Sequence, residues 1–242
     1  MSERASDSQD AVKSGADTAK SHTSGHRARL RARLLDRGAE TLADYELLEL
    51  LLCLAIPRRD VKPLAKSLID RFGSYGEVLA ATRGELETVS GLGEVAIAAI
   101  KTVEASIVAM TREEVMNRPV ISSWDALVRY LRSVMARDKR EQVRVLFLDK
   151  KNALIADEAQ SVGTIDHAPI YPREVVKRAL DLHASAIILA HNHPSGDPKP
   201  SKGDIKMTRE IVEACAKLDI AVHDHVVIGR FGHVSFKSMG LL

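Results

Sequence analysis

The sequence predicts a mixed α+β protein, with a small helical bundle in its amino-terminal half and an α/β domain in its carboxy-terminal half. Leucine-rich segments with helical spacing dominate residues 26–117, whereas β-branched and continuous apolar segments typical of strands begin after residue 120. From there, strand-like and helix-like segments follow one another, and 242 residues are enough for two modest cores. We therefore expect domains at 26–117 and 120–242.

Composition narrows the class of protein. Residues 1–25 are rich in Ser, Ala, Asp and Lys and contain no aromatic residue, so we expect a disordered tail. No stretch has the length of a membrane span and no signal-peptide block is present, which favours a cytoplasmic protein without a membrane partner. Cys53 and Cys215, each in an apolar pattern, read as buried thiols of a reducing compartment. A metal would therefore need histidine and carboxylate ligands.

The amino-terminal half reads as consecutive helices. The segment "LADYELLELLLCLAI" predicts a mostly buried helix, with Asp44 as its cap and Pro57 marking its end. The segment "DVKPLAKSLIDRFG" predicts a helix that stops at Gly73, and two or three more helices follow it up to Met110.

One stretch of this half has the form of a helix-hairpin-helix, namely "LETVSGLGEVAIAAIKTVEA". Gly91 and Gly93 relieve strain in the tight turn, and the amides that open the second helix can bind a DNA phosphate. Glu94 directly after the hairpin disfavours phosphate, and many such hairpins simply pack. The nearby basic segment supplies further candidate DNA contacts, which are Arg27, Arg29, Arg31 and Arg33, although a solvated basic helix face explains them equally well.

The carboxy-terminal half predicts alternating helices and strands. A helix over 123–135, capped by Ser123, precedes the paired strands "EQVRVLFLD" and "NALIADEAQSVG". Pro172 opens the helix "YPREVVKRALDLH", and "ASAIILAHNHP" is a central, doubly covered strand. Ser201 caps the amphipathic helix that begins "SKGDIKM", and two last strands flank the turn at 229–232.

Two histidines at the end of the central strand suggest a metal site. His191 and His193 are two residues apart and project to one side of a strand. A loop rich in Pro and Gly then leads to a helix whose first turn carries Asp204, three residues after Ser201. Two His and one Asp leave the fourth position of a tetrahedral zinc open for water, as in catalytic sites. A polar surface loop remains the alternative interpretation.

The stretch "HNHPSGDPKPSKGD" resembles the JAMM motif of the MPN-domain metalloproteases, which is His-x-His-Pro, seven residues, Ser, two residues and Asp. Its fixed positions are filled by His191, His193, Pro194, Ser201 and Asp204. Together with "YPREVVKRALDLHASAIILA", "DHVVIG" and "VSFKSMGLL", residues 26–242 are similar to the RadC family (UPF0758). The resemblance implies a JAMM/MPN α/β domain of the cytidine-deaminase-like kind.

The resemblance also implies roles for individual residues. It implies zinc at His191, His193 and Asp204, and a Ser201 that stabilises an oxyanion. The family pattern asks for a glutamate as general base just before the first core strand, where Glu141 stands in "REQVRVLFLD", with Glu158 and Glu174 as competitors. Support for the ligands can come from His223, Asp224 or His225, and strand alternation would put His223 and His225 on one face.

Two functions from different classes follow. The first is a zinc metallopeptidase that hydrolyses a peptide or isopeptide bond in a peptide or protein substrate. The alternative is a DNA-binding module associated with DNA repair, in line with the historical name of the family, in which the metal site is structural or vestigial.

Overall fold

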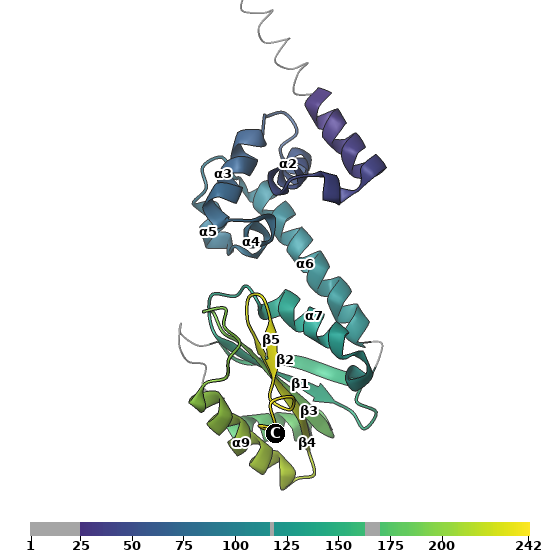
Figure 1. The fold of residues 1–242 in the computed structure, drawn as a ribbon, viewed down its shortest axis with the longest axis vertical. Helices are drawn as coiled ribbons and strands as arrows, with labels where there is room; N and C mark the ends of the chain where they lie inside the picture. Colours follow the sequence, from purple (N-terminus) through teal and green to yellow (C-terminus); the bar gives the residue numbers. More distant parts are fainter. Residues whose placement is uncertain (1–24, 117–118, 163–169) are drawn as a thin grey trace, which may run out of the picture. The chain divides into compact units, whose positions relative to one another are not determined.

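The structure is a computed structural model that describes residues 25–116, 119–162 and 170–242 (Figure 1). The chain forms two compact units, residues 1–104 and 105–242, and the division between them falls within the long helix α6 (Glu94–Met116). The sequence places this boundary later, at 117–120. The predicted tail lies outside the described residues, apart from Gly25. No helix in the described ranges is long and apolar enough to cross a membrane.

The first unit is helical, as the sequence predicts. After a helix over residues 25–37 come η1 (Ala39–Thr41), α2 (Asp44–Ala55), α3 (Lys62–Phe72), α4 (Tyr75–Ala80), α5 (Arg83–Glu87) and the start of α6. Leucines of α2 and α3 form its core with Val78, Leu86 and Ile100. Gly73 ends α3 with a φ of 98°, which confirms the predicted stop.

The predicted cap of α2 is wrong by one residue. Ala43 is the N-cap and Asp44 lies in the first turn. The Asp44 carboxylate instead accepts the backbone N–H of Tyr75 at 2.9 Å, which joins the start of α2 to the start of α4. A side chain that fits a local cap has here found a donor 31 residues away, which local spacing does not reveal.

The second unit is built on a sheet of five strands in the order β2-β1-β3-β4-β5. The strands are β1 (Gln142–Leu148), β2 (Leu154–Val162), β3 (Ala186–Asn192), β4 (Ala221–Ile228) and β5 (His233–Ser235). Strand β1 is antiparallel to β2 and β3, β3 is parallel to β4, and β5 is antiparallel to β4. All residues of β3 are buried, as expected for a doubly covered central strand.

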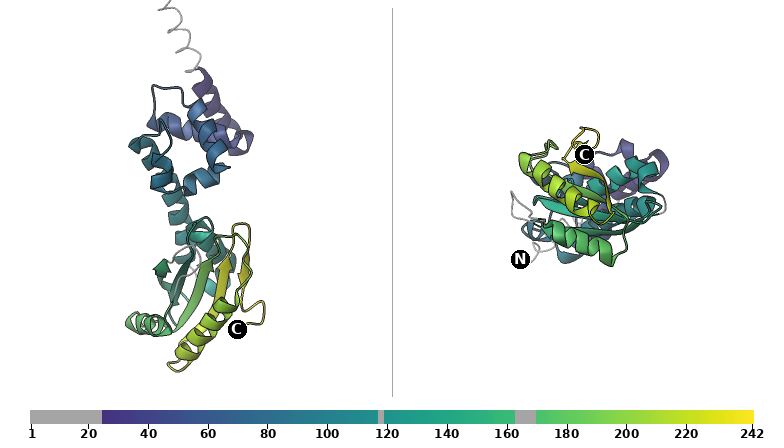
Figure 2. Two further views of the ribbon diagram at one scale, coloured as in Figure 1. Left: turned by 90° about the vertical axis from the view of Figure 1, so that its left-hand side faces the viewer. Right: turned by 90° about the horizontal axis from the view of Figure 1, so that it is seen from below.

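Helices cover both faces of this sheet. Helix α7 (Trp124–Met135) packs on one face, where Leu127 and Leu131 meet Ile188. Helices α8 (Pro172–Asp181) and α9 (Lys202–Ala216) pack side by side on the other face. Figure 1 shows α7 and α9 on opposite sides of the strands, and Figure 2 shows α9, in yellow-green, running along the sheet from two further directions. The expected mixed α+β fold is therefore confirmed.

A β-bulge interrupts the pairing of β3 with β4. Ile187 pairs with Val222, but the next residue, Ile188, pairs with Asp224, so His223 has no partner in the register. An extra residue of this kind reverses the alternation of side chains beyond it. The residues after the bulge, Asp224 to Ile228, pair with the second half of β3, Ile188 to Asn192.

Candidate metal centre

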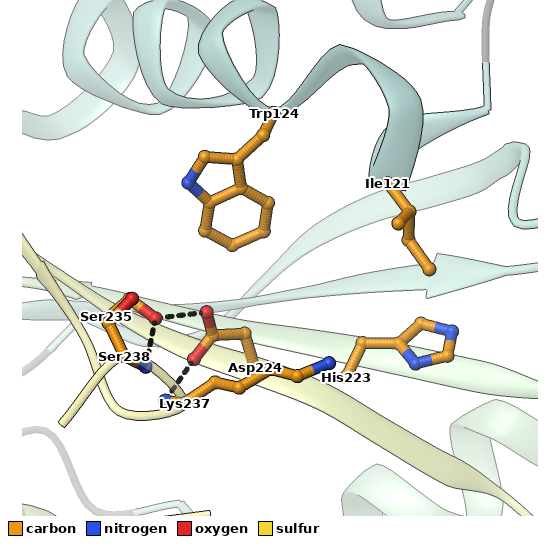
Figure 3. A pocket seen from close by; sticks show the side chains of 7 residues that line it. All are labelled: Ile121, Trp124, His223, Asp224, Ser235, Lys237 and Ser238. Atoms are coloured by element: carbon orange, nitrogen blue, oxygen red, sulfur yellow. Dashed lines mark hydrogen bonds between the residues drawn. The ribbon is translucent and has the colours of Figure 1, made fainter. Parts of the chain in front are cut away.

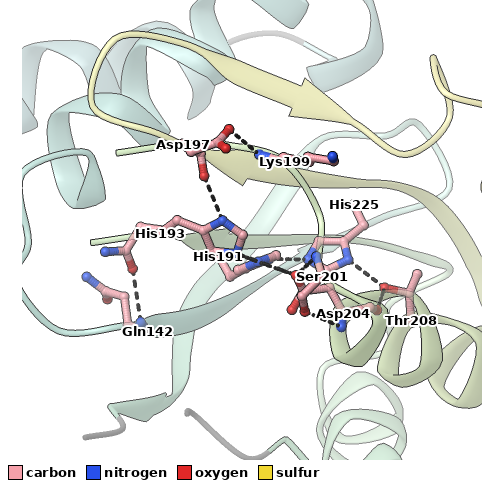
Figure 4. Close-up of polar contacts among 10 residues, drawn as sticks. Gln142, His191, His193, Asp197, Lys199, Ser201, Asp204, Thr208 and His225 are labelled. Carbon is pink, nitrogen blue, oxygen red and sulfur yellow. Dashed lines mark hydrogen bonds and ion pairs between the residues drawn. The ribbon is translucent and has the colours of Figure 1, made fainter. Parts of the chain in front are cut away.

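Three side chains converge at the carboxyl end of β3. His191 is buried within β3, His193 follows the strand directly, and Asp204 lies in the first turn of α9 (Figure 4). The Nε2 atoms of His191 and His193 lie 3.5 and 3.4 Å from Oδ2 of Asp204, and 2.9 Å from each other. The structure thus brings the three predicted ligands together as a group that could hold a metal ion.

The cap of α9 aims the carboxylate of Asp204. Ser201 is the N-cap, and its hydroxyl oxygen accepts the N–H of Asp204 at 3.1 Å. In return, the backbone N–H of Ser201 donates to Oδ2 of Asp204 at 2.6 Å, which completes a capping box. The oxygen that faces the histidines is therefore fixed by the start of the helix. The predicted Ser201 cap is confirmed, and its side chain lies at the edge of the cluster (Figure 4).

A chain of buried hydrogen bonds sets the tautomer of His191. Thr208 donates its hydroxyl proton to the carbonyl of Asp204 at 2.6 Å, so its oxygen accepts at its second contact, which is Nδ1 of His225 at 2.6 Å. Complete burial holds the pKa of His225 well below its usual value, so this ring is neutral and its Nε2 carries no proton. That atom accepts Nδ1–H of His191 at 2.7 Å. The Nε2 lone pair of a neutral His191 then faces the cluster.

The second histidine is oriented in the same sense. Nδ1–H of His193 donates to the backbone carbonyl of Asp197 at 2.8 Å, so Nε2 is again the atom that faces the cluster. The Asp204 carboxylate raises the pKa of His193 above its usual value, against the effect of burial, and the Asp197 carbonyl and the charge of Glu141 act in the same direction as Asp204. Positive charge is stabilised at this point.

The three donor atoms fit a divalent ion. Two imidazole lone pairs only 2.9 Å apart repel each other unless a cation, either a proton or a metal ion, lies between them. Ligand atoms of a tetrahedral zinc are separated by about 3.3 Å. Both His–Asp separations, 3.4 and 3.5 Å, are close to this value, whereas the His–His separation of 2.9 Å is shorter. Burial raises the pKa of Asp204, but hydrogen bonding to His191 and His193 outweighs this effect and holds the pKa well below its usual range. The carboxyl group is therefore ionised. Two nitrogens and one oxygen suit zinc and other first-row metals.

Glu141 directly precedes β1, the antiparallel neighbour of the strand that carries the ligands. Val143 of β1 is opposite His191, and if the same register and alternation continued for two more residues, Glu141 would be opposite His193. Glu141 is half-buried, and its charge contributes to the raised pKa of His193. The negative charge of Glu141 therefore acts on the side chain of a candidate ligand.

Asn192, between the two histidines, holds the segment that carries Glu141. Its side-chain oxygen accepts the N–H of Gln142 at 2.9 Å, and its amide donates to the carbonyls of Asp138 and Arg140 at 3.2 and 3.1 Å. These hydrogen bonds lie on both sides of Glu141. Asn192 occupies the variable position of the motif, so the motif does not predict this role, although an amide in a buried strand is itself a signal that it has partners.

The competing glutamates are engaged elsewhere. Glu158 of β2 accepts hydrogen bonds of 2.6 to 3.0 Å from Arg178 of α8, and these contacts lower its pKa against the effect of burial. Glu174 lies in the first turn of α8, is more than half exposed and pairs with Arg173 at 3.2 Å. Neither belongs to the group formed by His191, His193 and Asp204.

The bulge separates the two histidines of β4, so their predicted common face is wrong. His225 supports His191, whereas His223 lies on the α7 side, where its Nε2 contacts Oδ1 of Asn152 at 2.6 Å. Figure 3 shows Asp224 below Trp124 and His223 below Ile121. These four residues help to line a cavity of about 250 Å³. Asp224 is buried there and accepts hydrogen bonds from the Ser235 hydroxyl and the Lys237 N–H.

The candidate DNA contacts differ in their surroundings. Arg27 donates to the backbone carbonyls of Pro57 and Arg59, and Arg33 forms a two-bond pair with Glu46 at 3.0 Å. Arg29 and Arg31 are exposed. Gly91 has a φ of 84°, the left-handed conformation expected of the hairpin, whereas the φ of Gly93 is not positive. The carbonyl of Gly91 accepts a long hydrogen bond of 3.4 Å from Arg59.

Comparison with known proteins agrees with both halves of the chain. The family model of the RadC-like JAB domain matches residues 121–241, which include all three candidate ligands, and the UPF0758 N-terminal model matches residues 23–98. A UPF0758 protein of Rhodobacter capsulatus is 57% identical over 213 residues, or 88% of this chain and 100% of the relative. The chain therefore belongs to the UPF0758 family, with a RadC-like JAB domain as its second unit.

Proposed function

We propose that this protein is a zinc-dependent hydrolase that cleaves a peptide or isopeptide bond in a peptide or protein substrate. The observation that carries the proposal is the convergence of two imidazole Nε2 atoms and one carboxylate oxygen within 3.5 Å of one another. The charge of the half-buried Glu141, which raises the pKa of His193, supports it. A JAB domain is consistent with a hydrolase. His191, His193 and Asp204 would hold the ion.

The residues of the chain divide the remaining work. A zinc ion would supply Lewis-acid activation of a water molecule and of the scissile carbonyl. Glu141 accepts the proton of the attacking water and passes it to the leaving amine, as a general base that then acts as a general acid. Ser201 keeps its hydroxyl proton when its oxygen caps α9, so it can donate to the developing oxyanion. His225 and Thr208 keep the ring of His191 in its metal-binding tautomer.

Amide hydrolysis is favoured over deamination of a nucleobase. Zinc deaminases bind their ion through a Cys-x-x-Cys pair together with His or Cys. The two cysteines of this chain, Cys53 and Cys215, are free and lie in different units. Neither is one of the three residues that converge at the end of β3.

The test combines metal analysis with turnover. Purified wild type should contain one zinc ion per chain and should hydrolyse one member of a panel of fluorogenic peptides and isopeptide-linked conjugates. His191→Ala and Asp204→Ala should lose both the ion and turnover, because two ligands do not hold zinc tightly. Glu141→Gln should keep the ion and lose about 10²- to 10⁴-fold in turnover, the usual effect of removing a general base.

His233→Ala is the matched control, because His233 is exposed on β5 and is not one of the proposed ligands. It should keep both zinc and turnover. Zinc retained at wild-type stoichiometry in both Ala variants of the ligands would rule out the ligand set. Loss of zinc without any effect on a measured hydrolytic activity would rule out a catalytic role for the ion.

A further inference from the structure

We infer that the first unit carries a docking groove for an amphipathic helix with acidic flanks, supplied by a partner protein. This inference is independent of the proposed hydrolase. The groove, of about 530 Å³, lies between the helix over residues 25–37 and α2. We call it the leucine groove; six leucines line it, which are Leu34, Leu35, Leu47, Leu50, Leu51 and Leu54.

Contacts on the adjacent stripe of both helices hold the walls of the leucine groove in place. His26 lies 3.1 Å from Glu49, Arg33 pairs with Glu46 at 3.0 Å, and Leu30 is buried. These residues are spaced by three and four along each helix and so form one stripe. The neighbouring stripe of each helix faces the groove. Both walls are therefore fixed by contacts that leave Leu35 and Leu54 exposed, whereas Leu50 is buried and Leu51 packs against the core.

The pattern of the walls points to a helix as that occupant. On α2 the leucines stand at positions 47, 50, 51 and 54, the i, i+3, i+4, i+7 spacing of a face that packs against another helix. The residues of the other wall, at 27, 31, 34 and 35, follow a matching stripe. Leu35 is 81% exposed and Leu54 is 79% exposed. A third helix laid between two such stripes would bury them by ordinary ridge-and-groove packing.

The positive charge at the rim of the leucine groove favours a partner helix with negatively charged flanks. Arg27 and Arg31 line the leucine groove, and none of the described residues that line it is acidic. Arg27 donates to backbone carbonyls of the chain, so the exposed Arg31 is the cation that a partner would meet. The glutamates of α2, Glu46 and Glu49, are turned to the other stripe, where Arg33 and His26 pair with them. A helix with Glu or Asp along its flanks would complement this rim.

The same residues argue against nucleic acid as the occupant. A phosphate backbone is recognised by exposed cations and leaves apolar surface uncovered. Two of the four arginines, Arg27 and Arg33, are engaged with carbonyl or carboxylate groups of the chain itself, and Arg31 stands beside leucines. Arg29, which is exposed, does not line the groove.

The experiment uses the full-length protein and two synthetic amphipathic helical peptides. Both peptides carry the same leucine face, but the residues on either side of that face are Glu in one peptide and Lys in the other. Fluorescence anisotropy of the labelled peptides should show binding of the Glu peptide at least about tenfold tighter than the Lys peptide, or ~1.4 kcal/mol. Leu54→Ser and Arg31→Glu should each weaken binding of the Glu peptide by about tenfold or more. Leu54 and Arg31 are both exposed, so the fold should survive these changes, as circular dichroism will check.

Arg29→Glu is the matched control, because it makes the same charge change on the same helix away from the groove. It should change binding less than about twofold. Failure of the Glu peptide to bind, or equal binding of both peptides, would overturn the inference. So would a dimer in light scattering that Leu54→Ser dissociates, since the groove would then hold a second copy. Duplex DNA binding that both arginine variants weaken, and Leu54→Ser does not, would replace the helix with nucleic acid.

Discussion

The position of Glu141 depends on Asn192, a residue that does not itself face the cluster. Asn192 is the last residue of β3 and stands between the candidate ligands His191 and His193 in the sequence. Its side chain reaches the segment before β1. Asn192 thus joins the end of β3, which supplies candidate ligands, to the segment before β1, which supplies the proposed base. Loss of this side chain would free Glu141 without touching the ligand atoms.

Asn192→Ala should therefore separate chemistry from metal binding. We expect zinc content to stay at the wild-type level and kcat to fall by about tenfold to a hundredfold, because a base displaced by about 1 Å loses much of its effect. The buried N–H of Gln142 would lose its partner, at a cost of about 1–3 kcal/mol in unfolding free energy. Single-turnover kinetics and metal analysis on the same preparation measure both effects.

The control for this variant is Asn152→Ala, which removes an amide that contacts His223 on the α7 side of the sheet. It should lower the unfolding free energy but leave kcat per bound metal ion at the wild-type value. If Asn192→Ala retained full kcat, Asn192 would be a purely structural residue. If it lost zinc, its role would lie with the ligands rather than with Glu141.

The turn between β4 and β5 supports the loop that leaves β3. Arg230 N–H donates to the carbonyl of Gly196 at 3.2 Å, and Gly229 approaches the loop even more closely. A Cβ on Gly229 would lie 2.4 Å from the oxygen of Gly196 and 2.8 Å from Cδ of Pro198. Because the neighbouring Asp197 carbonyl orients His193, the hairpin is coupled to a candidate ligand.

Gly229→Ala should push this loop away and weaken the grip on the ion. Backbone and a proline ring cannot yield as a flexible side chain can, so we expect a cost of about 1–3 kcal/mol in unfolding free energy. Zinc affinity should fall by about tenfold to a hundredfold, the range found when groups that orient ligands are disturbed. Competition with a chromogenic chelator measures the affinity.

Gly232→Ala in the same turn is the comparison, because nothing lies within 4 Å of the added Cβ and its φ is not in the left-handed region. It should leave zinc affinity unchanged. Equal loss of affinity in both variants would mean that the turn itself matters, rather than its contact with the loop.

The sequence predicted these elements well where local patterns decide them. The apolar run of β3, Pro172 at the start of α8 and the Ser201 cap of α9 each have a local physical cause, and all three predictions are confirmed. The convergence of His191, His193 and Asp204 also follows from local rules, since a strand end, a short irregular loop and a helix start leave little freedom.

The features that the sequence did not predict all depend on pairing between distant segments. The face of His223 depends on a bulge against β3, the partner of Asp44 lies in α4, and the partners of Asn192 lie before β1. Alternation and capping rules describe one segment at a time, so they cannot anticipate these contacts. The leucine groove was missed for the same reason, because it needs two helices to form.

Each of the two units has its own core. Leu48, Leu68 and Ile100 belong to the core of the first unit, whereas Leu146 and Leu189 belong to the two cores on either face of the sheet. The candidate ligands all lie in the second unit, on β3, just after it and in α9. Ion binding should therefore stabilise one unit and leave the other unchanged.

Calorimetry of the full chain with and without zinc tests this expectation. Without the ion we expect two unfolding transitions, and saturating zinc should raise one of them, because an ion that binds only the folded state adds about 4 kcal/mol at a thousand times its Kd. Asp204→Ala should remove the shift while leaving the other transition in place. Leu48→Ala should lower the temperature of only the transition that zinc leaves unchanged. The expected loss of unfolding free energy is about 2–5 kcal/mol, since Leu48 is fully buried in the first core. A single transition that zinc and Leu48→Ala shift together would show instead that the two cores unfold as one.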